Sequence, residues 1–173
     1  GIPWTVIRSN FYVQYLSLFK GPVSKGILPL PIGNGRFSPV DVADVASFAR
    51  AVLSDPTPFR FKTFDLTGPT ALSGDDIASI LTRALGHPVR FEDATPDEAM
   101  GYLREAGLPD HETHGFRQFF ELTKRNSQFD MATTYYYKSV MKREPRSLED
   151  SVRLNKSTWL GESASSKSST GCC

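Results

Sequence analysis

Trp4-Thr5-Val6-Ile7-Arg8, which follows Pro3, is the stretch on which the fold assignment depends. Its β-branched residues predict a strand, and neither a turn nor a helix precedes that strand in the sequence. The chain therefore opens inside an element of secondary structure. Because Gly1 is not a methionine, we also expect that a segment before it has been removed or lost.

Strands and helices alternate after this first strand. Phe61 to Leu66 alternates aromatic and polar residues like a half-buried strand, and Val89-Arg90-Phe91 predicts another short one. Capping side chains followed by apolar residues at helical spacing predict helices over Asp41 to Leu53, Ser73 to Leu85, Thr95 to Gly107, a stretch after Pro109, and Ser147 through Leu154 toward Trp159. These elements indicate an α/β fold.

Two segments between these elements carry less regular signals. Aromatic and aliphatic residues from Phe11 to Phe19 predict a short amphipathic helix that Gly21-Pro22 stops. Ile27 to Ile32 and Arg36 to Val40 flank Gly33-Asn34-Gly35 in the manner of a hairpin or a strand-turn-strand crossing. In the helix that Asp41 begins, the residues expected to form the buried face are Val42, Val45, Ala46, Ala49 and Val52.

The composition is that of an ordinary globular chain. Hydrophobic residues make up 39% of the 173 residues and charged residues 23%, and the formal net charge is +1. So small a charge argues against nucleic-acid or membrane partners and favours a small-molecule substrate. With cysteine only at Cys172 and Cys173 and no apolar run of membrane-spanning length, we expect a cytoplasmic protein. The Ser-rich residues 161–173 are expected to be disordered.

Common catalytic and cofactor motifs are missing from the sequence. The nearest match to the G-x-G-x-x-G dinucleotide signature, Gly33-Asn34-Gly35, is not followed by a helix and is interpreted as a plain turn. No tyrosine stands four residues before a lysine, which is the spacing of ordinary short-chain dehydrogenases. His111 and His114 have the wrong spacing for a zinc helix, so no metal site is predicted.

An ordered set of motifs nevertheless resembles the second half of NmrA-like atypical short-chain dehydrogenases. The motifs are Gly1 to Phe11, Pro31 to Arg36, Asp41 to Ala46, Leu66 to Pro69, Leu72-Ser73 and Asp76 to Ala78. Three later motifs look like the fungal agroclavine/festuclavine dehydrogenase branch, which belongs to secondary metabolism: Gly107 to Pro109, Pro145 to Asp150 and Asn155 to Trp159.

This resemblance implies a fold and a cofactor. Residues 1–160 would form the C-terminal part of a Rossmann-like NmrA fold, with late strands of the sheet and a mainly helical substrate lobe, and without the N-terminal nucleotide-binding strands. The cofactor would be NADP or NAD, bound only weakly by this chain alone because the Gly-rich turn is missing. The resemblance also allows a homo-oligomer, or a partner chain that supplies the missing half.

The resemblance also suggests site residues. Arg8, Ser9, Asn10 and Phe11 would lie near the nicotinamide, although this segment departs from the family's usual Arg-Pro pattern. The apolar substrate pocket would be lined by Tyr12, Tyr15, Phe19, Phe116, Phe119 and Phe120. Tyr12 and Tyr15 are the candidate catalytic residues. Hydride delivery to an iminium or conjugated carbon needs little proton donation, so a missing Tyr/Lys pair would be tolerable.

Three functions remain open from the sequence. The first is the substrate-binding half of an NAD(P)-dependent reductase that acts on small, apolar or secondary-metabolite substrates. The second is a cofactor-independent isomerase or cyclase built on the same lobe, which would act by confinement and one acid or base. The third is a binding or regulatory module without turnover. Only the reductase requires NAD(P)H.

Overall fold

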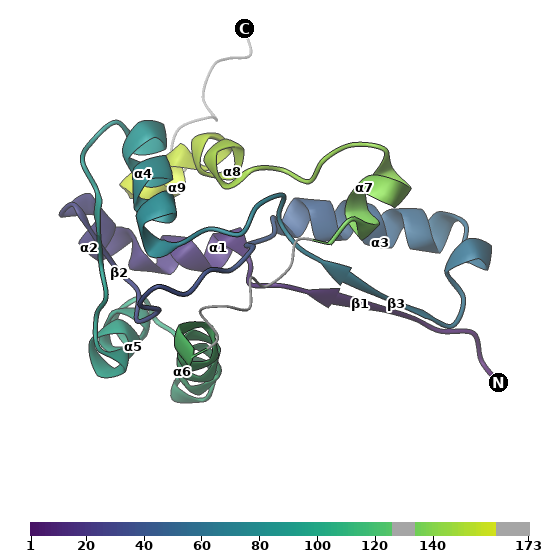
Figure 1. The fold of residues 1–173 in the computed structure, drawn as a ribbon, viewed down its shortest axis with the longest axis horizontal. Coiled ribbons are helices and arrows are strands. Elements are labelled where there is room, and N and C mark those ends of the chain that lie inside the picture. The colour runs from purple at the N-terminus through teal and green to yellow at the C-terminus, as the bar shows by residue number, and fades with distance from the viewer. Residues whose placement is uncertain (126–133, 162–173) are drawn as a thin grey trace, which may run out of the picture.

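A computed structural model describes residues 1–125 and 134–161 and shows a helix-rich α/β fold (Figure 1). Two short parallel sheets pair β1 (Thr5–Ser9) with β3 (Lys62–Leu66) and β2 (Ile27–Pro29) with β4 (Arg90–Glu92). The helices are α1 (Val13–Leu16), α2 (Lys20–Ser24), α3 (Val42–Ser54), α4 (Gly74–Leu85), α5 (Pro96–Glu105), α6 (Asp110–Arg125), α7 (Tyr136–Met141), α8 (Leu148–Leu154) and α9 (Lys156–Leu160). Single 3-10 turns cover Ser17–Phe19 and Thr57–Phe59.

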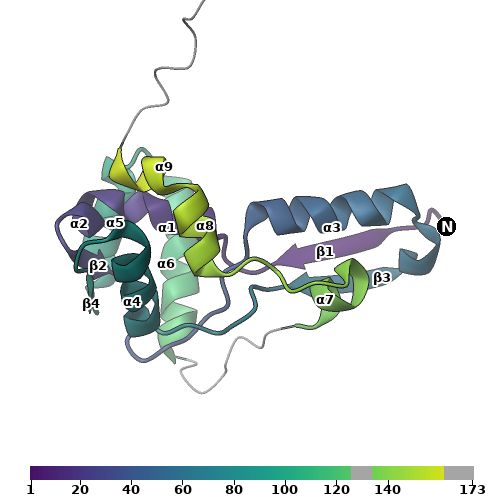
Figure 2. The same cartoon turned by 90° about the horizontal axis from the view of Figure 1, so that it is seen from above.

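The elements separate into two regions that lie side by side in both views of the molecule (Figures 1 and 2). The strand-helix unit consists of β1, β3, α3 and α7, and it has a small core of Phe48, Val52, Phe64, Leu66 and Tyr137. The helical lobe holds the remaining helices and the β2–β4 pair around a larger apolar core. Strand β1 runs from the far end of the unit, where the N-terminus lies, toward the lobe. Its carboxyl end therefore meets the lobe at the junction.

Two buried aspartates at the start of α3 tie the two regions together. The side chains of Asp41 and Asp44 are each only 1% exposed. Asp41 accepts hydrogen bonds from Ser151 Oγ of α8 at 2.6 Å and from the Arg146 guanidinium at 3.1 Å. Burial by itself would raise the pKa of Asp41, but the hydrogen bonds from Ser151 and the Ala43 amide and the charge of Arg146 lower it below the usual value.

Asp44 binds the segment that leads from α7 to α8. Its carboxylate accepts hydrogen bonds from Tyr137 Oη at 2.6 Å, from the Arg143 guanidinium at 3.0 Å and from the Arg146 backbone amide at 2.5 Å. Burial and the hydrogen bond to Asp44 raise the pKa of Tyr137. A buried charge is tolerated here because several donors replace the water it has lost.

The capping signals in the sequence correspond to real helix starts. Asp41 caps α3 by accepting from the Ala43 amide, and Ser147 caps α8. Helices α4 and α5 begin with reciprocal capping boxes, which pair Ser73 with Asp76 and Thr95 with Glu98. The predicted strands and the longer helices are thus confirmed to within one or two residues at most of their ends. The last predicted helix, from Ser147 toward Trp159, is instead divided at Asn155 into α8 and α9.

Of the two arrangements expected around Gly33-Asn34-Gly35, a hairpin or a strand-turn-strand crossing, the hairpin is not formed. Ile27–Pro29 pairs with β4 instead, in parallel, and Phe37 forms an isolated antiparallel bridge to Leu72. The turn itself exists, and α6 packs closely against it: a Cβ on Gly35 would come 2.4 Å from the Thr123 carbonyl oxygen. The close approach of α6, rather than hairpin geometry, explains the glycine.

Two further expectations were wrong in detail. Helical structure does not stop at Gly21-Pro22, because proline in the first turn of α2 has no intrahelical amide bond to lose. Of the predicted buried face of α3, Val52 is buried and Val45 packs against the core, but Val42 is 47% exposed and the face is completed by Asp44 and Phe48. Because Asp44 bonds to α7 and Asp41 bonds to α8, α3 packs with the face that carries Asp44 and not with its most apolar face. The predicted tail lies, beyond Gly161, outside the described residues.

Within the two described ranges, no helix is long and apolar enough to cross a membrane. The same residues contain no group of three or more His, Cys, Asp and Glu side chains placed to hold a metal ion.

Candidate functional site

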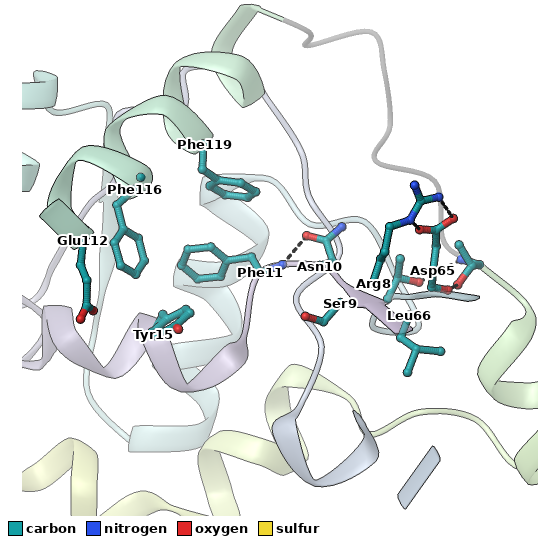
Figure 3. Close-up of a pocket in the computed structure, with 13 residues that line it drawn as sticks. Arg8, Ser9, Asn10, Phe11, Tyr15, Asp65, Leu66, Glu112, Phe116 and Phe119 are labelled. Carbon is teal, nitrogen blue, oxygen red and sulfur yellow. Dashed lines mark hydrogen bonds and ion pairs between the residues drawn. The ribbon is translucent and has the colours of Figure 1, made fainter. Parts of the chain in front are cut away.

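A pocket of about 910 Å³ opens at the junction of the strand-helix unit and the helical lobe (Figure 3). It lies at the carboxyl ends of β1 and β3, where side chains and backbone groups from two parallel strands face one crevice. Ligands of open α/β sheets bind at such strand ends. The lining residues are Arg8, Ser9, Asn10, Phe11, Tyr15, Asp65, Leu66, Thr67, Glu112, Gly115, Phe116, Phe119 and Thr134.

The strand side of the pocket is polar and charged. Arg8 and Asp65 are register partners on β1 and β3, and their side chains form a two-pronged ion pair at 2.6 and 2.9 Å. The hydrogen bond to Asp65 and its charge raise the pKa of Arg8. Thr67 Oγ1 accepts a hydrogen bond at 2.9 Å from the Thr134 amide, while the Thr134 hydroxyl donates to the Asp65 carbonyl.

The segment after β1 is held in a fixed turn. The Asn10 amide donates to the Leu66 carbonyl, and Asn10 Oδ1 accepts from the Phe11 amide at 2.6 Å. Ser9 Oγ donates to the Tyr12 hydroxyl at 2.8 Å. These bonds place the Asn10 side chain between the ion pair and the aromatic rings (Figure 3).

The helix side of the pocket is aromatic. Phe11 stacks on Phe119 at a centroid separation of 4.9 Å and meets Phe116 edge to face at 5.8 Å. Tyr15 packs edge to face on Phe116 at 4.9 Å and is 38% exposed. Among the described residues its hydroxyl has no hydrogen-bond partner. An aromatic ligand can therefore contact ring faces and edges on this wall.

The structure brings most of the predicted site residues together. Arg8, Ser9, Asn10 and Phe11, expected near the nicotinamide, all line the pocket beside three of the six predicted substrate aromatics, Tyr15, Phe116 and Phe119.

The other three aromatics do not line it. Phe19 and Phe120 are fully buried in the core of the lobe, so their expected ligand contact is corrected to a packing role. Tyr12 is not part of the lining either, and of the two candidate catalytic tyrosines only Tyr15 faces the pocket. Apolar periodicity cannot tell a pocket wall from the core behind it.

Sequence reasoning missed the second strand's contribution and the acidic residue on α6. Asp65, Leu66 and Thr67 enter the pocket because β3 pairs in parallel with β1. The end of the predicted strand at Leu66 was the available signal, since neighbouring parallel strands share one carboxyl edge. Glu112 gave no such signal, because it lies in an ordinary charged helix turn.

The pocket fits part of a dinucleotide. Asn10 and Thr67 offer polar groups at the strand ends that suit a nicotinamide carboxamide. The sequence provides no comparable site for the diphosphate. Its 173 residues contain no Gly-rich turn that leads into a helix and could donate backbone amides to the phosphates.

Two curated relatives of the chain are redox enzymes. The chain is 30% identical over 123 residues to an NAD(P)H azoreductase of Xenophilus azovorans, covering 70% of this chain and 43% of the relative. It is 27% identical over 171 residues to agroclavine dehydrogenase of Claviceps fusiformis, covering 92% and 56%. The chain is similar to NAD(P)-dependent reductases. No protein-family model matches the sequence.

The fold is also shared with solved reductases. An NADPH-dependent quinone oxidoreductase of Escherichia coli superposes with a TM-score of 0.77 at 21% identity, covering 90% of this chain and 56% of that one. At this identity the match shows the fold alone. The chain spans about half the length of the curated relatives it matches.

Proposed function

We propose that the chain forms the substrate-binding side of the active site of an NAD(P)-dependent reductase that acts on small, apolar aromatic substrates. The observation that carries this proposal is the pocket itself. It joins the carboxyl ends of two parallel strands to a wall of aromatic rings, and it includes the whole Arg8 to Phe11 segment. The similarity to an azoreductase and to agroclavine dehydrogenase supports the reductase class.

The residues of the pocket have two roles: they orient substrate and cofactor, and they shield the substrate from water. Phe11, Phe119 and Tyr15 hold a flat substrate by stacking and edge contacts and exclude water from its faces. Asn10 and Thr67 orient the nicotinamide end of the cofactor from the strand side. When bound, NAD(P)H supplies the hydride, so the protein has only to hold donor and acceptor face to face. Tyr15 Oη is the pocket's candidate proton donor.

The dinucleotide phosphates are held by residues outside these 173, either in a partner chain or in another part of a longer one. The basis is the missing Gly-rich turn, whose backbone amides and helix N-terminus are the principal diphosphate donors in dinucleotide-binding folds. We further propose a cytoplasmic setting and a secondary-metabolite substrate, the latter supported by the likeness to agroclavine dehydrogenase.

Ligand binding to the chain tests this function. Menadione, a small apolar quinone, should bind and quench intrinsic fluorescence, and Phe119→Ala should weaken that binding about tenfold by removing a stacking ring. Tyr15→Ala should weaken it less, because this ring is partly exposed. The matched control is Leu122→Ala, which changes an exposed residue of the same helix outside the pocket.

Equal menadione affinities for Phe119→Ala, Leu122→Ala and the unaltered chain would contradict the proposal, provided thermal melts show all three folded. Turnover of a substrate without either nucleotide would instead favour an isomerase or cyclase.

A further inference from the structure

One carboxylate lines the aromatic end of the pocket without a strong partner. Glu112 projects from the first turns of α6 beside Tyr15 and Phe116 (Figure 3). Its side chain is 51% exposed, and among the described residues its one ion-pair contact is with the imidazole of His111, whose Nε2 lies 3.9 Å from the carboxylate.

The other charges of the pocket balance each other. Arg8 is joined to Asp65 through two short contacts, 2.6 and 2.9 Å, at the strand side. Its guanidinium is therefore already neutralised by a carboxylate, and Figure 3 shows the pair on the far side of the aromatic rings from Glu112. Of the described lining residues, two carry carboxylates and one a guanidinium, which leaves the pocket one negative charge in excess.

The aromatic wall adds to this preference. Ring faces carry the negative part of the aromatic quadrupole, and cations within about 6 Å of a ring centroid are attracted to it. Phe11, Tyr15 and Phe116 meet in edge-to-face pairs, so the planes of the three lining rings differ. A carboxylate beside several rings is a combination that suits quaternary and protonated amines.

From this arrangement we propose that the pocket accepts neutral aromatic substrates but prefers flat aromatic ones that carry a positive charge, with Glu112 as the residue that determines the preference. This inference rests on the proposed function, because it specifies the substrate class of the same pocket. The aromatic rings provide the affinity shared by neutral and cationic ligands. Glu112 adds the part that depends on charge.

A pair of ligands of nearly equal shape separates the two contributions. N-methylacridinium is a permanent cation, and acridine is its neutral counterpart in mildly alkaline buffer. Fluorescence titration of the full chain should show the cation binding about threefold to tenfold more tightly than acridine at low salt. Raising the salt concentration should weaken only the cation, because screening acts on the charge of Glu112.

Glu112→Gln keeps the size of the side chain and removes its charge. This variant should lose the preference for N-methylacridinium while binding acridine as before. Glu121→Gln is the matched control, since Glu121 belongs to the same helix and does not line the pocket. It should keep the preference of the unaltered chain.

The outcomes distinguish this inference from the proposed function. Equal binding of the two ligands by the unaltered chain, or an unchanged preference in Glu112→Gln, would overturn the role of Glu112. If Phe119→Ala still weakened both ligands in that case, the aromatic pocket would stand as the substrate site. If no pocket variant changed the binding of either ligand, both proposals would be wrong.

Discussion

The helical lobe and the strand-helix unit are stabilised in different ways. The lobe surrounds a continuous apolar core, including the fully buried Phe19, Leu81 and Phe120, and three of its helices, α4, α5 and α8, begin with side-chain caps. The unit buries only a small apolar cluster. It is joined to the lobe by Asp41, which binds Ser151 of α8, and by Asp44, which binds Arg143 and the Arg146 amide in the segment that leads to α8. The pocket at their boundary therefore takes its aromatic wall and Glu112 from the better packed region, and the Arg8–Asp65 ion pair from the other.

Removing a ring from the core of the lobe should have the largest effect on stability. Phe120→Ala should lower the free energy of unfolding by about 3 to 5 kcal/mol, because Phe120 is fully buried and contacts several other rings. Chemical denaturation measures this change. A greater loss for Phe64→Ala, in the small core of the unit, would reverse the comparison.

Neutralising the buried tie at the junction should have the next largest effect. Asp44→Asn should cost about 2 to 3 kcal/mol, since charge-assisted hydrogen bonds from Tyr137, Arg143 and the Arg146 amide are weakened together. Asp97→Asn is the control, because the ion pair of this carboxylate with Arg117 is at the surface. Similar denaturation midpoints for both variants would mean that the junction does not depend on its buried charge.

A single helix cap in the lobe should contribute less to the free energy of unfolding. Thr95→Ala should destabilise by about 1 kcal/mol, because it removes the side-chain acceptor for the Glu98 amide at the start of α5. The midpoint of chemical denaturation is again the measurement. An unchanged midpoint would show that α5 is held by packing alone.

The smallest expected effect concerns acid stability. Hydrogen bonds from the Ser73 amide and hydroxyl, together with Arg36, lower the pKa of Asp76 below its ordinary value. A lowered folded-state pKa adds stability that is complete above the unfolded pKa of about 3.9 and disappears as the pH falls through the folded value. Asp76→Asn should therefore be less stable than the unaltered chain at neutral pH, and the difference should shrink in acid. A difference that stayed constant with pH would contradict this linkage.

Local signals in the sequence were sufficient for most of the fold. Ser73, Thr95 and Ser147 marked helix starts correctly, because a capping side chain acts on amides only two or three residues away. The hairpin at Gly33-Asn34-Gly35 failed because strand pairing depends on distant partners, here β4 and Leu72. The place of Asp44 on the packed face of α3 was missed for the same reason, since the partners of Asp44 are remote in sequence.

The same distinction between local and distant contacts applies to the residues of the site. Arg8 to Phe11 are contiguous, so one resemblance located all four at the pocket. Asp65 and Thr67 join them only through the parallel register of β1 and β3. Phe120 and Phe116 belong to one helix and have the same chemistry, yet Phe120 faces the core and only Phe116 lines the pocket. The helical period alone does not say which residues contact a ligand.

Calorimetric titration of the chain with NADPH, NADH and menadione tests the central claim most directly. Losing several charge-assisted hydrogen bonds to the diphosphate, each contributing about 1.5 to 3 kcal/mol, moves a micromolar nucleotide site to the millimolar range or beyond. The pocket should still bind menadione, about tenfold more tightly than it binds either nucleotide. Micromolar binding of NADPH or NADH by these 173 residues, or quinone binding weaker than nucleotide binding, would contradict the assignment of this chain to the substrate side of a reductase site.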